Sequence, residues 1–318
     1  MKPLVNEFTW SVSRNGLFQE CRRAYYYQYY GSWNGWDAGA PERTRRIYLL
    51  KNLKTLDMWG GTIVHDTIAE ALRRYAIKAA PITAGELQAT ARQKLRAGWL
   101  EAVNGEWRTS PKKTNLAELY YGNGATLPPE QTERIKAKIY DCLRAFAESA
   151  LLKQIQAATY LAWQPVDKLD SFLLDETKVW CAVDFAYTDP AGALRIIDWK
   201  TGGENEDALQ LQLACYAFFA ADKWRAKLEN LRVYGVFLRD NAREKEYPLT
   251  PEILIEARER MLQSAAGMRG FLRSPLANEP LPEEEFPLCT RERTCARCNF
   301  RELCPGAPKA PAAAPAQV

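Results

Sequence analysis

The chain has 318 residues, enough for one large domain, and its 47 % hydrophobic and 26 % charged residues are ordinary for a globular protein. No apolar run approaches the roughly 20 residues that cross a bilayer, and residues 1–7 lack the apolar stretch of a secretory signal, so we expect a cytoplasmic protein. A formal net charge of +4 permits a polyanionic partner without requiring one.

Helical patterns account for most of the first half of the chain. Residues 17–30 are predicted to form an N-terminal helix that carries Cys21 and a run of tyrosines. Apolar side chains recur at helical spacing in residues 62–78, and residues 84–163 are predicted to be mostly helical with breaks at Gly- and Pro-containing loops. Two groups of basic residues also lie here, each interpreted on its own as solvated surface: Arg43, Arg45, Arg46, Lys51 and Lys54, and then Arg108, Lys112 and Lys113.

The composition changes near residue 170 to one that is typical of strands. Residues 171–187 and 193–199 are rich in β-formers, and the turn signal between them predicts an antiparallel hairpin. Residues 206–222 follow as a strongly apolar helix, residues 231–238 as another strand, and residues 244–249 as a partner for that strand.

This order of elements predicts an α/β core with a mixed central sheet flanked by helices, together with a large helical portion. We expect one domain over residues 1–306, with the helical part at about 62–165 and the catalytic core at about 170–250. Pro251 is predicted to open a further helix. Residues 307–318 are rich in Ala and Pro and are predicted to form a disordered tail.

Two aspartates and a lysine are the first candidates for a catalytic site. The predicted hairpin places Asp184 on one strand and Asp198 on its neighbour, and Lys200 shares a face with Asp198 because strand side chains alternate. A buried aspartate needs a compensating partner, and Mg²⁺ or Mn²⁺ would supply one. Such a metal polarises a phosphate and acidifies bound water, and Lys200 would hold that water or neutralise charge on the phosphate. Taken alone, the Asp-x-Lys pattern is more often a surface ion pair.

Three further polar residues extend this set. His65 is the only histidine, and it follows two glycines at the start of the amphipathic stretch, where it becomes a candidate metal ligand in company with the two aspartates. Gln212 and Tyr216 lie four residues apart on the apolar helix, so they share one face. A polar pair on such a helix must meet partners, such as active-site backbone or a DNA phosphate, or else lie half exposed at a rim.

The C-terminal cysteines indicate a second inorganic site. Cys295, Cys298 and Cys304 have the close spacing of zinc or iron–sulfur ligands, and a fourth ligand would be Cys21 or Cys289. Cys289 gives the simpler local set of four thiolates. The other three cysteines are interpreted as core residues: Cys142, Cys181 and Cys215.

The motifs in this order resemble those of the RecB-like branch of the PD-(D/E)XK nuclease superfamily, over about residues 8–306. They are Gly-x-x-x-His at 61–65, Val183-Asp184, Asp198-Trp199-Lys200-Thr201-Gly202 and Gln212-x-x-x-Tyr216. The resemblance implies a restriction-endonuclease-like core in which a metal is surrounded by His65, Asp184, Asp198 and the backbone carbonyl of Trp199. It also implies that Asp184, Asp198 and Lys200 are catalytic, with Gln212 and Tyr216 supporting the site.

The same resemblance bears on the cysteines. AddB-type nuclease domains and CRISPR-associated RecB-like exonucleases hold a 4Fe–4S cluster with one N-terminal cysteine and a C-terminal trio. By similarity, the ligands here would be Cys21, Cys295, Cys298 and Cys304, with Cys289 as a spare and the cluster region at 21 and 289–304. Closing so long a loop would stabilise the domain, and we expect the cluster to be structural.

The expected function is therefore a Mg²⁺- or Mn²⁺-dependent exonuclease that acts on single-stranded DNA ends in repair, recombination, phage or CRISPR-related processing. The chain has no P-loop, so unwinding would need a partner such as a helicase. The alternative is a DNA-end-binding subunit of a larger assembly with little cleavage of its own. An iron–sulfur electron carrier is disfavoured by the hydrolytic residues.

Overall fold

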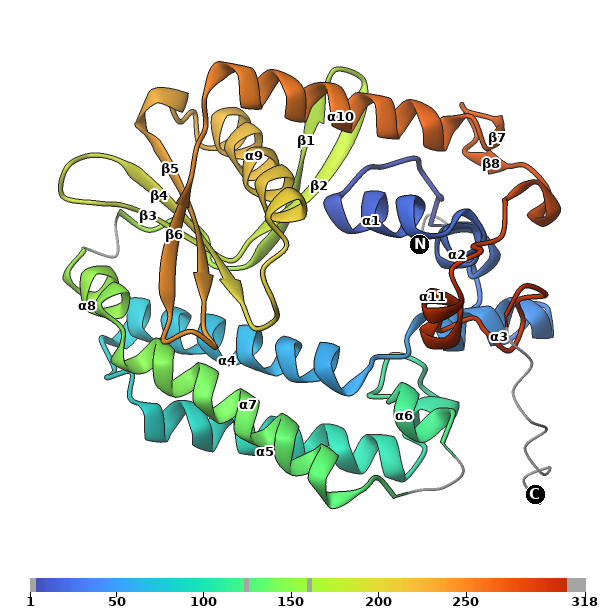
Figure 1. Cartoon of the computed structure of the whole chain (residues 1–318), viewed down its shortest axis with the longest axis horizontal. Helices are drawn as coiled ribbons and strands as arrows, with labels where there is room; N and C mark the ends of the chain where they lie inside the picture. The colour runs from blue at the N-terminus through green and yellow to red at the C-terminus, as the bar shows by residue number, and fades with distance from the viewer. Residues whose placement is uncertain (1–3, 123–125, 159–161, 308–318) are drawn as a thin grey trace.

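The structure is a computed structural model that describes residues 4–122, 126–158 and 162–307. Almost all of the tail predicted at 307–318 lies outside the described residues. Helices form the first half of the chain, and a mixed sheet with further helices forms the second half (Figure 1).

The N-terminal helix expected at 17–30 is divided into three pieces. These are α1 (Val12–Glu20), α2 (Arg22–Tyr26) and the π-helical turn η1 (Tyr27–Gly31). Cys21 separates the first two because its backbone is extended, with φ −159° and ψ 117°, and its sulfur accepts a hydrogen bond from the backbone N–H of Ala24. Cys21 therefore caps a helix start, a role in which a side chain satisfies one of the free N–H groups.

The long helix that carries His65 begins earlier than its apolar pattern predicts. It is α4 (Leu56–Lys78), and Thr55 caps it by accepting from the N–H of Met58. His65 and both preceding glycines therefore lie inside the helix. The other elements of this half are α3 (Glu42–Lys51), α5 (Ala84–Val103), η2 (Glu106–Arg108), α6 (Ala117–Tyr120), α7 (Pro129–Glu148) and α8 (Ala150–Ala157).

The single strand predicted at 171–187 is in fact two strands in two sheets. β2 (Thr177–Val183) pairs antiparallel with β1 (Lys168–Leu174), and β3 (Phe185–Thr188) begins the main sheet. The bend between β2 and β3 falls at Asp184.

The main sheet is mixed, as predicted. Its strand order is β3-β4-β5-β6, formed by β3, β4 (Leu194–Lys200), β5 (Leu231–Phe237) and β6 (Arg243–Tyr247). β4 and β5 are parallel, and the two outer pairs are antiparallel. The helix α9 (Glu206–Lys223) connects the parallel pair, because parallel strands cannot be joined by a tight turn.

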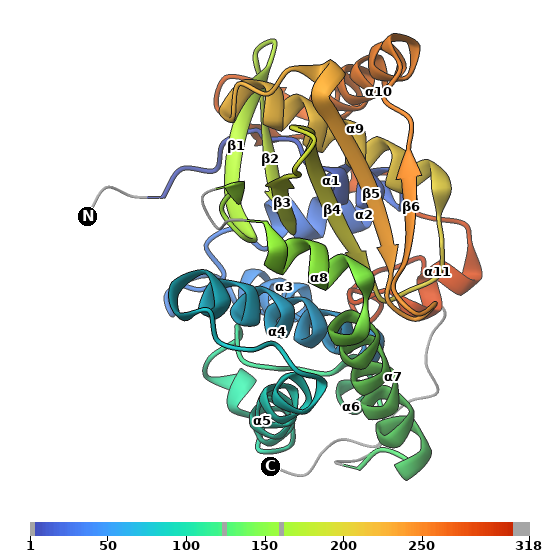
Figure 2. The same ribbon diagram turned by 90° about the vertical axis from the view of Figure 1, so that its left-hand side faces the viewer.

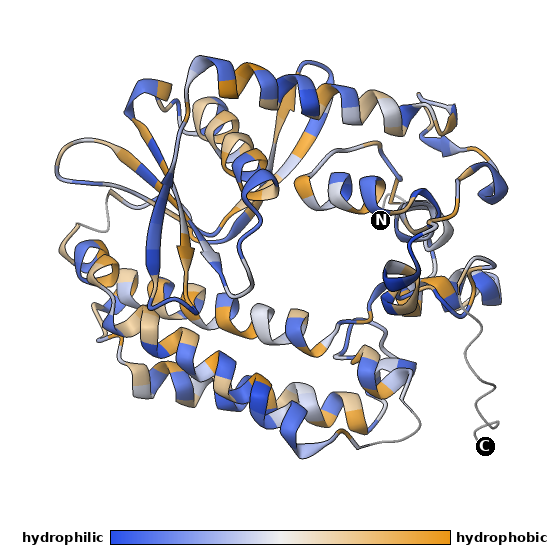
Figure 3. Cartoon of the chain, in the orientation of Figure 1, coloured by the Kyte–Doolittle hydropathy of each residue, from blue (hydrophilic) through white to orange (hydrophobic). Residues whose placement is uncertain are grey.

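Helices cover both faces of this sheet, as Figures 1 and 2 show. Side chains alternate between the two faces of β4, and each face has its own hydrophobic cluster. Ile196 packs with residues of α9 and α10 (Pro251–Arg269), whereas Ile197 packs with residues of α4 and α7. The apolar character of α9 is visible in Figure 3. No helix in the described ranges is long and apolar enough to cross a membrane.

The C-terminal segment returns to the N-terminal helices. It comprises β7 (Leu272–Ser274), β8 (Glu279–Pro280), η5 (Glu283–Glu285) and α11 (Glu292–Arg297), and the residues after α11 reach α3, where Arg46 pairs with Glu302. Arg23 Nε donates to the carbonyl of Phe286 at 3.0 Å, and the rings of Tyr27 and Phe300 lie 5.2 Å apart. Residues from the two ends of the described chain thus form one packing unit.

Candidate functional site

The two aspartates lie at neighbouring strand ends. Phe185 pairs with Ile197, so Asp184 in the bend before β3 lies next to Asp198 on β4. The sequence analysis predicted that Asp184 lies within a strand. It lies instead in the bend where the chain passes from the β1–β2 sheet to the main sheet.

Asp198 is buried within a network of polar side chains. It is 2 % exposed, and its Oδ1 accepts hydrogen bonds from Gln212 Nε2 at 2.9 Å and from the Tyr216 hydroxyl at 3.1 Å. Lys200 Nζ lies 2.6 Å from Asp198 Oδ2 and donates to Gln212 Oε1 at 2.9 Å. The four side chains come together because Asp198 and Lys200 share one strand face, and Gln212 and Tyr216 share one face of α9.

Burial changes the electrostatics of Asp198. Removal from water raises the pKa of Asp198 most, the charge of Asp184 adds to this, and together they outweigh Lys200, so the pKa is about 6. Oδ2 is buried and accepts no well-aligned hydrogen bond from the described residues, although it touches the Lys200 ammonium. The Lys200 ammonium uses one of the two lone pairs of Oδ2, so a second remains for a metal ion.

Asp184 connects the helical layer to the end of the sheet. Its Oδ1 lies 3.3 Å from His65 Nδ1, and its Oδ2 accepts a hydrogen bond from the backbone N–H of Trp199 at 2.8 Å. The carbonyl of Lys200 accepts from Leu238 on the β5 side. Successive carbonyls of a strand point to opposite sides, so the Trp199 carbonyl faces the side of Asp184.

His65 projects from the middle of α4 toward this carboxylate. Burial alone would lower the pKa of His65, but the charge of Asp184 and its hydrogen bond prevail and raise the pKa to about 9. The helix approaches closely because of Gly61, where an added Cβ would lie 3.1 Å from Thr201 Oγ1, just after β4. The expectation that these glycines permit close approach is met at Gly61.

The donors fit a hard divalent cation. They are carboxylate oxygens, a backbone carbonyl and an imidazole, and oxygen donors are the ligands that Mg²⁺ prefers. Within the described residues, no group of three or more His, Cys, Asp or Glu side chains is already arranged as a metal shell. The carboxylates are instead hydrogen-bonded to Gln212, Tyr216 and the Trp199 amide.

One acidic residue near the site was missed by the sequence analysis. Asp167 precedes β1, its N–H donates to the carbonyl of Val183, and its backbone has φ 46°. Burial and the charge of Asp184 raise the pKa of Asp167. No motif contains it, and its position depends on the β1–β2 hairpin, which the sequence did not separate from the following strand.

The five candidate cysteines line a single pocket of about 470 Å³. Cys21 contributes from the start of α2, and the others from α11 and its flanks: Cys289, Cys295, Cys298 and Cys304. Burial raises the pKa of Cys298 to about 12. The other three cysteines are buried elsewhere, at 0 % exposure for Cys142, 4 % for Cys181 and 1 % for Cys215, so their interpretation as core residues is confirmed.

A mixed sheet with helices on both faces, and an Asp-x-Lys pair beside a second aspartate, are consistent with the α/β fold of PD-(D/E)XK nucleases. The profile of the PD-(D/E)XK nuclease superfamily matches residues 9–305, and the chain belongs to this superfamily. Its members are nucleases that generally use Mg²⁺ or Mn²⁺. A comparison with curated proteins gives no match.

Proposed function

We propose that this chain is a Mg²⁺- or Mn²⁺-dependent deoxyribonuclease of the RecB-like type, acting as an exonuclease on single-stranded DNA ends. The observation that carries the proposal is the buried Asp198 network, in which Lys200, Gln212 and Tyr216 fix the orientation of a carboxylate beside Asp184. A structural core has no need of so many polar groups at the end of an apolar strand.

The residues that would hold the metal are His65, Asp184, Asp198 and the Trp199 carbonyl. When bound, the metal would polarise the scissile phosphate and acidify a water molecule. His65 contributes from the helical layer, whereas the other three donors come from adjacent ends of the sheet.

Lys200 is the candidate for stabilising the reacting phosphate. Its ammonium is held between Asp198 Oδ2 and Gln212 Oε1, so its position is set before substrate arrives. A fixed cation beside developing negative charge lowers the barrier because little reorganisation is needed. Gln212 orients both groups, since its amide nitrogen donates to Asp198 while its oxygen accepts from Lys200.

We also propose that the cysteine pocket holds a structural 4Fe–4S cluster bound by Cys21, Cys295, Cys298 and Cys304. The support is that these cysteines line one pocket, although Cys21 is far from the others in the sequence. Cys289 lines the same pocket and is the alternative fourth ligand. Cysteine thiolates are the usual ligands of such clusters.

The test is digestion of linear and circular single-stranded DNA by anaerobically purified wild type with Mg²⁺ or Mn²⁺. Asp198→Ala is the site variant, and Asp222→Ala is the matched control, because Asp222 is exposed and its only ion pair among the described residues is with the adjacent Lys223. We expect wild type and the control to degrade linear DNA alone, and Asp198→Ala to lose the activity. Degradation of the circular single-stranded DNA as well would indicate endonuclease activity.

Absence of cleavage by folded, cluster-loaded wild type would favour the second candidate, a DNA-end-binding subunit. The digestion would then be repeated with a helicase present, because the sequence contains no P-loop motif of its own to drive unwinding.

A further inference from the structure

The cysteine pocket collects side chains that become negatively charged when they bind a metal centre. Cys21 lines it from the start of α2, whereas Cys295, Cys298 and Cys304 line it from α11 and the residues that follow. Four thiolates leave an iron–sulfur centre with a net negative charge, which is one of the quantities that set its reduction potential. A cation held beside these cysteines would therefore stabilise the bound centre.

Backbone N–H groups already donate to two of the four sulfurs. Cys21 Sγ accepts from the N–H of Ala24 at 3.4 Å, and Cys298 Sγ accepts from the N–H of Phe300 at 3.4 Å. Hydrogen bonds of this kind favour the charged thiolate, which is the form that binds iron. The local backbone thus suits anionic ligands, and a side chain with positive charge would add to this effect.

Arg291 connects the two parts of the chain that supply the cysteines. Its Nη2 donates to the carbonyl of Glu20 at 2.8 Å, and this carbonyl belongs to the peptide group that continues into Cys21. The carbonyl of Arg291 accepts the N–H of Cys295 at 3.0 Å, since Arg291 is the N-cap residue of α11. Arg291 thus holds the Cys21 segment with its side chain and Cys295 with its backbone.

No carboxylate neutralises the charge of Arg291 within the part of the chain that the structure describes. It forms no ion pair there, and Glu20 is the one acid among the residues that line the pocket. Contact with the sulfur of Cys289 raises the pKa of Arg291 most. The charges of Glu20 and Cys21 raise it further, so the guanidinium lies within electrostatic reach of both thiols.

We propose that Arg291 is a positioning residue for the metal centre of the cysteine pocket. Its side chain holds Cys21 against the C-terminal cysteines, and its positive charge offsets part of the negative charge of the bound thiolates. The inference rests on the 4Fe–4S cluster proposed above. Both candidates for the fourth ligand lie beside Arg291, because its side chain reaches the peptide before Cys21 and its N–H donates to Cys289 Sγ at 3.4 Å. The role therefore holds for either ligand set.

The experiment uses the full chain purified without air, and it measures three properties of Arg291→Gln. These are the iron bound per chain, the rate at which the visible absorption of the cluster is lost in air, and the midpoint potential in a dithionite titration. Far-UV circular dichroism of each variant establishes that the chain is folded.

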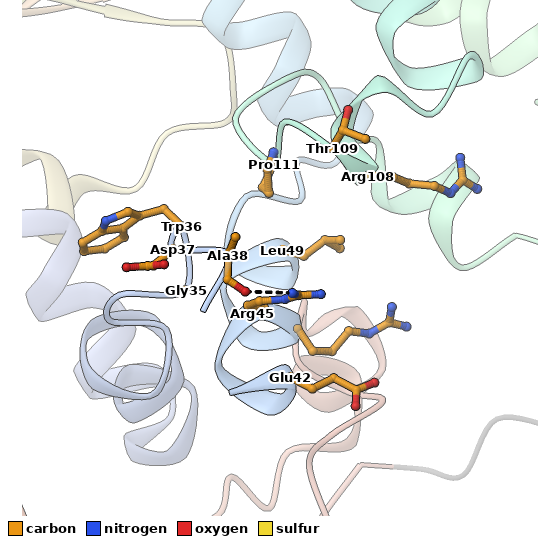
Figure 4. A pocket seen from close by; sticks show the side chains of 11 residues that line it. Gly35, Trp36, Asp37, Ala38, Glu42, Arg45, Leu49, Arg108, Thr109 and Pro111 are labelled. Atoms are coloured by element: carbon orange, nitrogen blue, oxygen red, sulfur yellow. Dashed lines mark hydrogen bonds between the residues drawn. The ribbon is translucent and has the colours of Figure 1, made fainter. Parts of the chain in front are cut away.

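Arg45→Gln is the matched control. Arg45 is exposed like Arg291, and its Nη1 donates to a backbone carbonyl, that of Ala38, at 3.2 Å (Figure 4). It also has no ion-pair partner among the described residues. The pocket that Arg45 lines, of about 410 Å³, has no cysteine among its lining residues. The two variants therefore remove the same charge and the same kind of hydrogen bond, but only Arg291 lies beside the cysteines.

Arg291→Gln should bind less iron than the control and lose its absorption about tenfold faster, since loss of a group that orients a metal ligand typically costs about tenfold or more in affinity. Its reduction equilibrium should shift about tenfold toward the oxidised form, which is about 59 mV for one electron, because a positive charge beside the reduced centre is lost. Arg45→Gln should match wild type in all three measurements.

Arg291→Lys separates the two roles. A lysine keeps the charge but lacks the planar fork that holds the Glu20 carbonyl in a fixed geometry. We therefore expect a midpoint potential close to that of wild type, and a rate of absorption loss between those of wild type and Arg291→Gln. Equal potentials in the lysine and glutamine variants would overturn the electrostatic role.

Arg291→Gln that matches Arg45→Gln in iron content, in rate of loss and in potential would overturn the whole proposal. Wild type that contains no iron after anaerobic purification would be a different result, because it would remove the cluster itself and with it the role of Arg291. Failure of the nuclease function is distinct from both, since DNA cleavage plays no part in these measurements.

Discussion

Asp198 destabilises the metal-free fold at neutral pH, because its pKa of about 6 lies above the ordinary value near 4. A carboxyl with a raised pKa binds its proton more tightly in the folded state, so stability is fully present below about pH 4 and is lost as pH rises through 6. A metal ion bound at the proposed site would offset this cost, because it would compensate the buried negative charge.

Asp198→Asn should therefore stabilise the metal-free protein. We expect a gain of about 2 kcal/mol at pH 8 and a smaller gain at pH 5, where wild type is itself protonated. Urea unfolding of both proteins in EDTA at the two pH values measures this difference. A variant that is less stable than wild type at pH 8 would show that burial of Asp198 is already compensated without metal.

Tyr216→Phe should slow cleavage without unfolding the chain. The hydroxyl donates to Asp198 Oδ1 at 3.1 Å and accepts from Gln212 at 2.8 Å, so its loss removes one of the two hydrogen bonds that orient this oxygen. We expect kcat to fall about tenfold, in the range for loss of one charged hydrogen bond. Tyr247→Phe, which removes a phenol that donates to Glu204, is the matched control and should leave kcat unchanged.

For single residues, strand alternation and helix spacing in the sequence predicted which side chains of the site share a face. Asp198 with Lys200 and Gln212 with Tyr216 follow from strand alternation and helix spacing. Asp167 reaches the site only through the packing of the β1–β2 hairpin, which is a tertiary feature that no short pattern encodes.

Among the elements, α4 joins the helical layer to the catalytic end of the sheet. Its contact depends on Gly61, which faces Thr201 Oγ1 closely enough that any larger side chain must move one of them. The sequence indicated close approach here but placed the helix start six residues too late, since the apolar periodicity begins after Thr62 while the cap lies at Thr55. The capping contact, rather than the apolar stripe, defines where α4 begins.

Gly61→Ala should reduce activity more than stability. Alanine favours the helix by about 1 kcal/mol, which offsets the crowding at Thr201, but His65 would shift from Asp184. We expect cleavage to recover in Gly61→Ala/Thr201→Ala, where the opposing oxygen is absent. Gly16→Ala, at a helical position with open space around it, is the control and should only raise the melting temperature.

The sheet shows where sequence patterns are weakest. The β-rich run at 171–187 is continuous in composition, yet it serves two sheets because the chain bends at Asp184. The mixed character of the sheet was predicted, and the parallel β4–β5 pair accounts for it, since α9 between these strands supplies the required crossover.

For the whole molecule, the cysteine pocket is the feature that unites the two ends of the described chain. We expect Cys21→Ser to lose the visible absorption of an iron–sulfur cluster and to lower the melting temperature, because the ordering of a very long loop is lost with it. Iron analysis and unfolding curves measure both effects. Cys142→Ser, in the helical core, is the comparison that destabilises without removing iron.

Cys289→Ser decides between the two ligand sets. Under our assignment it keeps full iron content, since the thiols of Cys21, Cys295, Cys298 and Cys304 remain. If Cys289→Ser loses iron and Cys21→Ser keeps it, the fourth ligand is Cys289 and not Cys21.

The pairing of distant segments also sets the order of events during synthesis. Tyr27 packs on Phe300 and Arg43 pairs with Glu283, so the N-terminal helices wait on the ribosome for partners that are translated more than two hundred residues later. The sheet can assemble before that moment, because its strands lie between residues 185 and 247. A chain that ended before Glu283 would thus lack the partners of Arg43 and Tyr27, and its N-terminal helices would expose to water the aromatic surface that Phe286 and Phe300 cover in the folded protein, a surface on which incomplete chains aggregate.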